Sequence, residues 1–135
     1  AMAAPAAAEE MISYTTDQSY EDVVFGLENA ILDEWLVIDS TSHVGAMLER
    51  TRADVGSDVV LFEAADVYSF CSAQLSREVM EADPMNIVFC PYDIFVARQP
   101  GDDSTMIGYR SFPDGEMQKI QTLLDRIARN AIGME

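Results

Sequence analysis

Positive charge is what this sequence has least of. Lysine and arginine together number 8, Lys119 being the only lysine, against 24 acidic residues, which gives a formal net charge of -16. Phosphate binding needs a lysine- and arginine-rich surface, so we expect no nucleic-acid partner, and anionic membranes are disfavoured for the same reason. An acidic surface poor in lysine fits a protein that works in high salt, where screening weakens self-repulsion; ordinary acidity for solubility is the alternative.

Long apolar runs are also missing. Hydrophobic residues make up 49% of the 135-residue chain, but their runs fall far below the ~18 residues that would span a bilayer. We therefore expect a soluble chain with one hydrophobic core and one domain, covering residues 11–135.

The first ten residues are rich in alanine and carry one proline but no apolar stripe. We expect residues 1–10 to be a disordered tail. They also resemble the end that a signal peptidase leaves after small residues, which makes the periplasm the expected compartment and the cytoplasm the alternative. The compartment matters because disulfides persist in oxidising surroundings and are rare in the cytosol.

Catalytic signatures are absent as well. The sequence contains no Cys-x-x-Cys, no His-x-x-x-His, no GxGxxG and no GxxxxGK[ST] pattern. This removes the usual zinc-binding and nucleotide-binding motifs. With 24 acidic residues in the chain, chance pairs of carboxylates carry no weight as acid–base catalysts. The sequence therefore favours a binding or accessory domain over an enzyme.

Apolar spacing predicts the secondary structure. Helices are expected over residues 20–33, 44–56, 67–82 and 114–132, and strands over 11–15, 35–40, 59–63, 87–96 and 105–112. Pro91 interrupts the fourth strand and cannot donate to a ladder, so we expect this strand to be an edge or to bulge. The order β-α-β-(α)-β-α-β-β-α predicts an α+β fold, a single two-layer domain with a mostly antiparallel sheet and helices on one face.

Both cysteines follow a phenylalanine, in the near-duplicate settings Phe70-Cys71-Ser72 and Phe89-Cys90-Pro91. Cys71 lies roughly 18 Å along the predicted helix from the turn at Asp83-Pro84, and Cys90 lies roughly 20 Å along the following strand. Neighbouring elements usually pack antiparallel, so we expect the two sulfurs to approach each other. They could pack as small hydrophobes, form a structural disulfide, or act as a functional thiol pair in redox chemistry or metal binding.

His43 is the only histidine and stands where a predicted strand gives way to a helix. A capping or solvent-facing side chain is the plain interpretation. As a metal ligand, His43 would need partners, and Cys71, Cys90, Met80 and Met85 are the soft side chains on offer. Sulfur ligands with one imidazole suit copper, or haem iron.

The stretch from Ile12 to about Phe112 has an opening strand, a Tyr/Ser-rich lead into the first helix, and the segment Asp39–Gly56. The apolar run Val59–Glu63, a helix, and the Cys90-Pro91 step into a closing hairpin follow. In these features the chain resembles the bacterial and archaeal family called domain of unknown function 302. The resemblance implies a compact α+β domain of the TATA-binding-protein type that tends to form homodimers, and it supplies no established activity.

The chain also departs from that family. Many members carry Leu-Pro before the hairpin, where this chain has Cys90-Pro91, and Asn-Pro after the third strand, where it has Glu63-Ala64-Ala65-Asp66. The chain therefore looks like a cysteine-bearing branch.

Two functions from different classes are consistent with the sequence. The first is a dimeric binding or accessory domain with a small-ligand, metal or haem site near Cys71, Cys90 and His43, where Tyr92 or Tyr109 closes a pocket beside Cys90. The second is a thiol–disulfide or sulfur-carrier protein that uses the two cysteines. The missing Cys-x-x-Cys favours the first.

Overall fold

The computed structural model describes residues 10–135, which form five strands, four α-helices and one 3₁₀ helix. In chain order these are β1 Met11–Thr16, α1 Tyr20–Asp33, β2 Ile38–Ser42, α2 Val44–Thr51, β3 Ala64–Phe70, α3 Ala73–Ala82, the 3₁₀ helix η1 Pro84–Phe89, β4 Tyr92–Arg98, β5 Thr105–Arg110 and α4 Gln118–Ala131. The tail expected over residues 1–10 lies, apart from Glu10, outside the described residues. Glu10 is joined to the sheet, because its carbonyl oxygen accepts from the backbone N–H of Ser111 at 2.7 Å.

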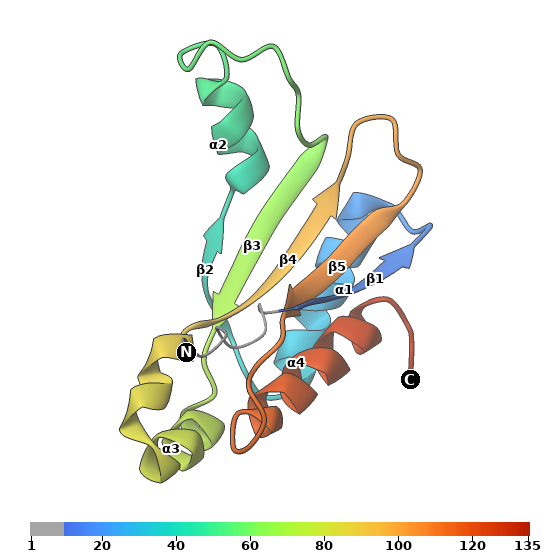
Figure 1. The fold of residues 1–135 in the computed structure, drawn as a ribbon. Helices are drawn as coiled ribbons and strands as arrows, with labels where there is room; N and C mark the ends of the chain where they lie inside the picture. Colours follow the sequence, from blue (N-terminus) through green and yellow to red (C-terminus); the bar gives the residue numbers. More distant parts are fainter. Residues whose placement is uncertain (1–9) are drawn as a thin grey trace, which may run out of the picture.

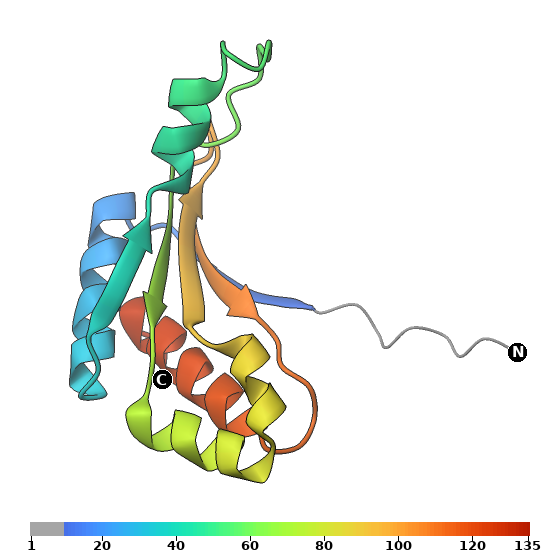
Figure 2. The same ribbon diagram turned by 90° about the vertical axis from the view of Figure 1, so that its left-hand side faces the viewer.

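The described strands form one antiparallel sheet in the order β1-β5-β4-β3-β2. α1 and α4 pack against each other on one face of it; α1 lies behind the strands in Figure 1 and to their left in Figure 2. The core lies between these two layers. Its fully buried side chains are Val23, Leu27 and Ile31 of α1, Ile120, Leu124 and Ile127 of α4, and Phe70, Ile94, Val96 and Ile107 of the sheet. The predicted two-layer α+β class and the order of elements are confirmed.

α1 is the element that the sequence predicts best, since its expected and observed bounds coincide. Ser19 caps its start, its Oγ accepting from the backbone N–H of Asp22 at 3.1 Å. Gly26 lets the helix approach α4 closely: a Cβ at this position would lie 2.1 Å from the carbonyl oxygen of Ala131. The two helices therefore meet backbone to backbone.

The middle of the chain differs from the prediction. Residues 59–63 are irregular, and the third strand is β3, where the sequence pattern predicts the start of a helix. The apolar side chains at 59, 60 and 61 are 61%, 45% and 52% exposed, so this run does not enter the core. The helix begins only at Ala73, because its cap is Ser72 and not Asp66.

The segment before β4 is helical rather than extended. η1 occupies residues 84–89, and Asp83 caps it by accepting from the backbone N–H of Met85 at 3.0 Å. β4 starts after Pro91 and lies between β5 and β3 in the middle of the sheet. The expectation of a broken edge strand is therefore wrong: Pro91 precedes the ladder and removes no hydrogen bond from it.

Among the described helices, only α1 and α4 cover the sheet. α2 and the irregular residues 52–63 project beyond one end of the strands, and α3 with η1 lies at the other end, as Figures 1 and 2 both show. The expectation that a helix over 67–82 packs on the sheet is corrected accordingly, since α3 packs mainly on η1. In residues 10–135, no helix has both the length and the apolar character to cross a bilayer.

Candidate functional site

The pairing of β3 with β4 brings the two cysteines together. The ladder between these antiparallel strands ends at Phe70 and Tyr92. Cys71 follows Phe70 directly and Cys90 stands two residues before Tyr92, so both lie at the same end of the strand pair. Their Sγ atoms are 3.1 Å apart. The expected approach of the sulfurs is observed, but it comes from strand pairing and not from a helix packed on a strand.

α3 and η1 form the connection between the cysteines. At its start, Ser72 Oγ accepts from the backbone N–H of Leu75 at 3.2 Å, which begins α3 immediately after Cys71. In the middle, the side-chain amide of Asn86 donates to the carbonyl of Val79 at 2.8 Å and ties η1 to α3. The chain then enters β4 through a cis peptide bond between Cys90 and Pro91. Both sulfurs are thus held by hydrogen-bonded elements.

A depression of about 390 Å³ opens beside Cys90. Its lining is mostly apolar and aromatic, with one charge of each sign: Val67, Val88, Phe89, Cys90, Pro91, Tyr92, Asp93, Phe95, Tyr109, Arg110 and Phe112. The rings of Phe89 and Phe112 pack in a T-shaped arrangement, with the edge of one ring against the face of the other and the centroids 5.6 Å apart. An apolar group attached to a reacting sulfur would find ring surface here.

Tyr92 and Tyr109, the residues expected beside Cys90, both line this depression. The hydroxyl of Tyr92 lies 2.9 Å from Ser76 Oγ, and the hydroxyl of Tyr109 donates to Asp125 at 2.8 Å. Burial and then the bond to Asp125 raise the pKa of Tyr109 well above its usual range. Tyr92 and Tyr109 are only 1% and 2% exposed, so their rings belong to the core and offer almost no surface to a ligand in the depression.

The two thiols are not equivalent. Burial raises the pKa of Cys71 to about 12, and the hydrogen bond to Cys90, the charge of Cys90 and the charge of Asp39 act in the same direction. Cys71 is therefore protonated at neutral pH, and the thiolate is the nucleophilic form of cysteine. In the described chain Cys90 belongs to the lining of the depression and Cys71 does not. A ligand in the depression reaches Cys90 first.

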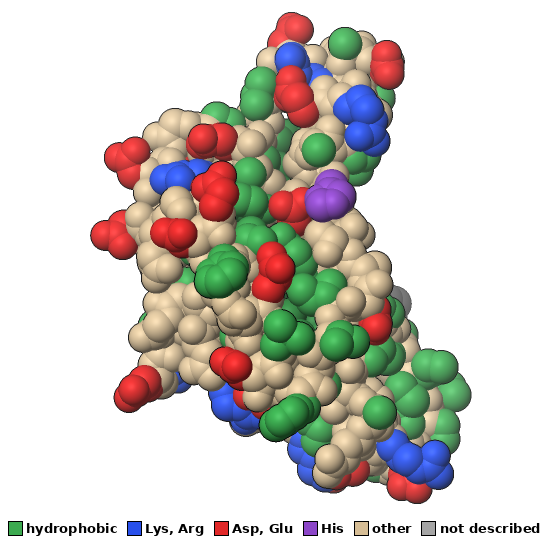
Figure 3. All heavy atoms as spheres, turned by 180° about the vertical axis from the view of Figure 1, so that it is seen from behind, with side chains coloured by type: hydrophobic (Ala, Val, Ile, Leu, Met, Phe, Trp, Pro, Cys, Tyr) green, Lys and Arg blue, Asp and Glu red, His purple; other side chains and the backbone are tan. Residues whose placement is uncertain are grey.

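His43 lies at the other end of β3. Its Nδ1 is 2.7 Å from one oxygen of Asp66, whose second oxygen accepts from the Tyr20 hydroxyl at 2.5 Å. Asp66 is five residues before Cys71, roughly 16 Å along an extended strand. The histidine side chain is 71% exposed and appears on the surface beside an acidic side chain in Figure 3. The structure does not bring His43 to the cysteines.

The two methionines of the proposed ligand set differ in how far they are exposed. Met80 is partly buried against the core, whereas Met85 is 68% exposed on η1. Over residues 10–135, no three or more His, Cys, Asp or Glu side chains form a group that could hold a metal ion. Among these soft ligands, the sulfurs of Cys71 and Cys90 are 3.1 Å apart, whereas His43 lies at the far end of β3.

Sequence reasoning missed three residues of this site. Asp39 acts on Cys71 because β2 pairs with β3 so that Ile38 lies opposite Phe70. Arg110 and Phe112 reach the depression from the end of β5. The positions of all three follow from the register of neighbouring strands. That register can be predicted only when β3 is assigned to the correct residues.

Comparison with known proteins agrees with this description of the fold. The family model described as "Domain of unknown function DUF302" matches residues 12–130. The fold is similar to a crystal structure of an uncharacterized conserved protein DUF302 from Bacillus stearothermophilus, with a TM-score of 0.63 and 16% sequence identity over 90% of this chain and 91% of that chain. No curated protein matches the sequence. These likenesses support the fold and leave the chemistry to be argued from the residues themselves.

Proposed function

This chain belongs to the family of domains of unknown function DUF302, and from its own residues we propose that it is a thiol–disulfide exchange domain that uses Cys90 and Cys71. The observation that carries the proposal is the 3.1 Å contact between the two sulfurs. A disulfide bond is about 2.05 Å long, so only a small movement is needed when a substrate disulfide takes up the two electrons and the two thiol protons are released. Both cysteines are partly exposed, as is typical of exchangeable bridges.

The first step takes place at Cys90, which borders the depression. Its thiolate attacks one sulfur of a substrate disulfide R–S–S–R′, forming a Cys90–S–S–R bond while the bond to R′ breaks. The R′ thiolate leaves and takes up a proton from water. The apolar and aromatic lining favours substrates that carry an apolar group next to the sulfur, on a peptide or a small molecule.

The second step takes place at Cys71. It loses its proton to solvent and attacks Sγ of Cys90, so that the Cys71–Cys90 disulfide forms and R leaves as the second thiol product. Two electrons and two protons have then passed from the chain to the substrate. Because the pKa of Cys71 is raised to about 12, its thiolate fraction grows about tenfold per pH unit below that value. This step should therefore accelerate with pH across the neutral and mildly alkaline range.

The compartment sets the resting state of such a pair. An oxidising compartment favours the disulfide, and the cytosol keeps thiols reduced. We place the protein in the periplasm as part of this proposal, because an oxidising compartment lets the disulfide state of the pair persist.

Trapping the mixed disulfide tests the proposal. With oxidised glutathione, Cys71→Ser should accumulate a glutathione adduct at Cys90, because the resolving thiol is missing, whereas the wild type should pass on to the internal disulfide. Cys90→Ser is the matched control and should gain little adduct, because burial raises the pKa of Cys71 and this thiol does not line the depression. Intact-mass spectrometry after acid quenching measures all three. Equal adducts on both variants, or unreacted wild-type thiols, would contradict the assignment.

We further propose that the chain is a homodimer through the face of the sheet that the described helices leave uncovered. This face carries a groove of about 610 Å³ lined mainly by apolar side chains. Val67 is paired with Phe95 there, and Ala97 with Met106. The charged residues on the same face of β4 and β5 are Asp93 and Arg110, of opposite sign, although the chain carries -16. The groove lining also contains the carboxylates of Asp66 and Asp102, so its apolar side chains, and not a lack of charge, support this interface.

Met106→Asp should convert the dimer into a monomer. Met106 is half-buried in the groove, so a carboxylate there would be desolvated against the second copy, while the fold is retained. Sedimentation equilibrium of the wild type should give about twice the 14.9 kDa chain mass, and the variant about that mass itself. Val88→Asp, on the exposed side of η1, is the control and should stay dimeric. A wild type that is monomeric at all salt concentrations refutes this interface.

A further inference from the structure

α1 ends on a tryptophan in the left-handed conformation. Trp35 has a φ of 63° and follows the C-cap residue Glu34. Its backbone N–H donates to the carbonyl of Leu32 at 2.9 Å, and the next N–H, of Leu36, donates to the carbonyl of Ile31 at 3.2 Å. This is the Schellman arrangement, in which the left-handed position is usually a glycine because a Cβ is strained there.

Packing does not explain why this residue is a tryptophan. Its side chain is 95% exposed, so the indole buries almost no surface within residues 10–135. Glycine would form the same turn with less strain, and a polar side chain would be better solvated. Trp35 therefore lowers folding stability in two ways, through its strained φ and through its exposed indole. Residues held in such strained conformations cluster at functional sites. Tryptophan is also enriched among the residues that dominate binding at protein interfaces.

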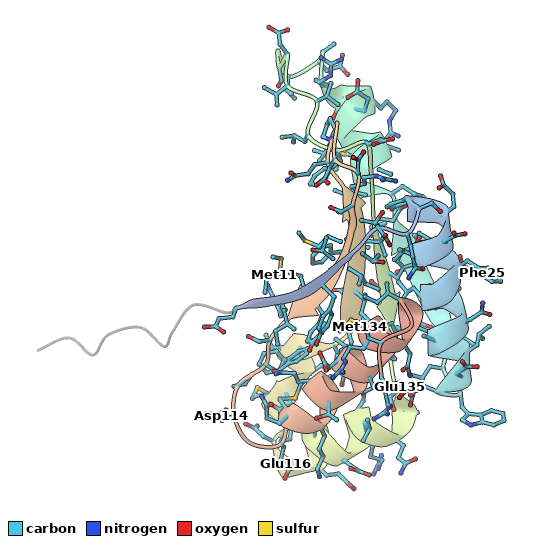
Figure 4. All side chains as sticks on the ribbon, turned by 90° about the vertical axis from the view of Figure 1, so that its right-hand side faces the viewer. Met11, Phe25, Asp114, Glu116, Met134 and Glu135 are labelled. Atoms are coloured by element: carbon cyan, nitrogen blue, oxygen red, sulfur yellow. The ribbon has the colours of Figure 1, made fainter. Side chains whose placement is uncertain are left out.

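Trp35 does not stand alone. An exposed apolar strip follows the outer side of α1 to its end: Phe25 is 67% exposed, Leu32 57% and Val37 64%. Phe25 and Leu32 are seven residues apart, two turns of the helix, and so share one face. Figure 4 shows Phe25 pointing away from the body of the domain, and Figure 3 looks onto the side of the molecule where α1 lies. Exposed apolar side chains gathered on one face are typical of interaction sites.

The segment that carries the strip contains acidic side chains and no basic ones. Residues 20–37 contain no lysine, arginine or histidine and five acidic residues: Glu21, Asp22, Glu28, Asp33 and Glu34. Glu34 is paired with Arg126, and the other four are exposed. This charge argues against an anionic membrane and against a second copy of a chain that carries -16. It complements a partner that is apolar and basic.

We propose that the strip formed by Phe25, Leu32, Trp35 and Val37 binds a basic amphipathic helix of another protein. Apolar side chains of that helix, spaced three or four residues apart, lie along the strip, and its lysines and arginines face the acidic side chains of this segment. A guanidinium or ammonium group stacks on the indole of Trp35. This surface contains neither sulfur, but its far end comes close to Cys71, because Val37 precedes Ile38 and Ile38 lies opposite Phe70.

The test uses a fluorescein-labelled peptide of leucine and lysine, about four turns long, with leucine at every third or fourth position. Wild-type protein should bind it in the micromolar range at about 0.15 M salt, and the emission of Trp35, the only tryptophan, should shift to shorter wavelength. Trp35→Gly should weaken binding by at least about tenfold, measured by anisotropy. Its melting temperature should equal or exceed that of the wild type, because glycine relieves the strained φ. Loss of binding is then not loss of fold.

Two controls separate this surface from general attraction between opposite charges. Ile87→Ala removes an apolar side chain that is 59% exposed on η1 and lies outside the lining of the depression, so it should leave peptide binding unchanged. A leucine–glutamate peptide of the same pattern should not bind. The proposal is overturned if the wild type fails to bind the basic peptide, if Trp35→Gly binds it as tightly as the wild type does, or if anionic vesicles alone shift the Trp35 emission.

Discussion

Oxidation of Cys71 and Cys90 to a disulfide should raise the free energy of unfolding by about 3 kcal/mol, because the bridge closes a loop between residues 19 apart and restricts the unfolded chain. For a domain of this size, that corresponds to a rise in melting temperature on the order of 10 °C. The comparison is between the oxidised and the fully reduced wild type, at one salt concentration and one pH, followed by denaturant or thermal unfolding.

The single-cysteine variants make this comparison specific. Cys71→Ser and Cys90→Ser should unfold identically with and without reductant, since neither can form the internal bridge. Their stability should match that of the reduced wild type to within the small cost of replacing a partly buried thiol. If oxidised and reduced wild type unfold alike, the sulfurs do not bridge in solution and the exchange proposal loses its basis.

Gly26→Ala should destabilise the domain by about 3 kcal/mol, although alanine is the better helix former by roughly 1 kcal/mol. The added Cβ would lie 2.1 Å from the carbonyl oxygen of Ala131. Because that oxygen belongs to the backbone, the contact cannot be relieved by a rotamer change, and α1 must move away from α4. Urea unfolding followed by circular dichroism measures the loss.

Asn29→Ala is the matched control for Gly26→Ala. Asn29 is exposed on the same helix, so alanine there should leave the stability unchanged or raise it slightly through helix propensity. A Gly26→Ala variant as stable as the control would mean that α1 and α4 do not pack backbone to backbone, and the two-layer arrangement described above would need revision.

The sequence predicts the elements that bury a regular stripe and fails where apolar residues stay exposed. α1 is predicted exactly, because Ser19 caps it and every fourth residue from Val23 enters the core. The apolar residues 59–61 match the pattern of a buried strand, yet they are exposed in the segment that projects beyond the sheet. Periodicity reports a pattern of apolar residues; it does not report whether a partner surface exists to bury them.

The candidate site shows a second limit. The sequence analysis predicts that Cys71 approaches Cys90, and the Sγ atoms are indeed 3.1 Å apart. The route to that prediction is nevertheless wrong: Cys71 ends a strand rather than lying within a helix, and η1 replaces the start of the fourth strand. Two compensating errors leave the sulfurs at the same end of neighbouring elements. By contrast, His43 lies at the far end of β3, and only the register of the sheet reveals this.

Trp35 could not have been assigned from the sequence. It opens an apolar run that is typical of a strand, and the usual glycine that marks the end of a helix is missing at this position. Only the backbone shows that α1 ends there and that the indole is turned to solvent. Local propensity is overridden at this residue, and such departures are expected where binding rather than folding decides the amino acid.

A redox titration of the thiol pair tests the central claim most directly. Reduced protein is equilibrated in buffers of reduced and oxidised glutathione, quenched with acid, alkylated and counted by mass. An exchange-active pair should show one reversible two-electron transition in which both thiols disappear together, with a midpoint above about -300 mV, the range of exchangeable rather than structural disulfides. Two thiols that persist in every buffer, or a bridge that only forcing reductants open, would contradict it.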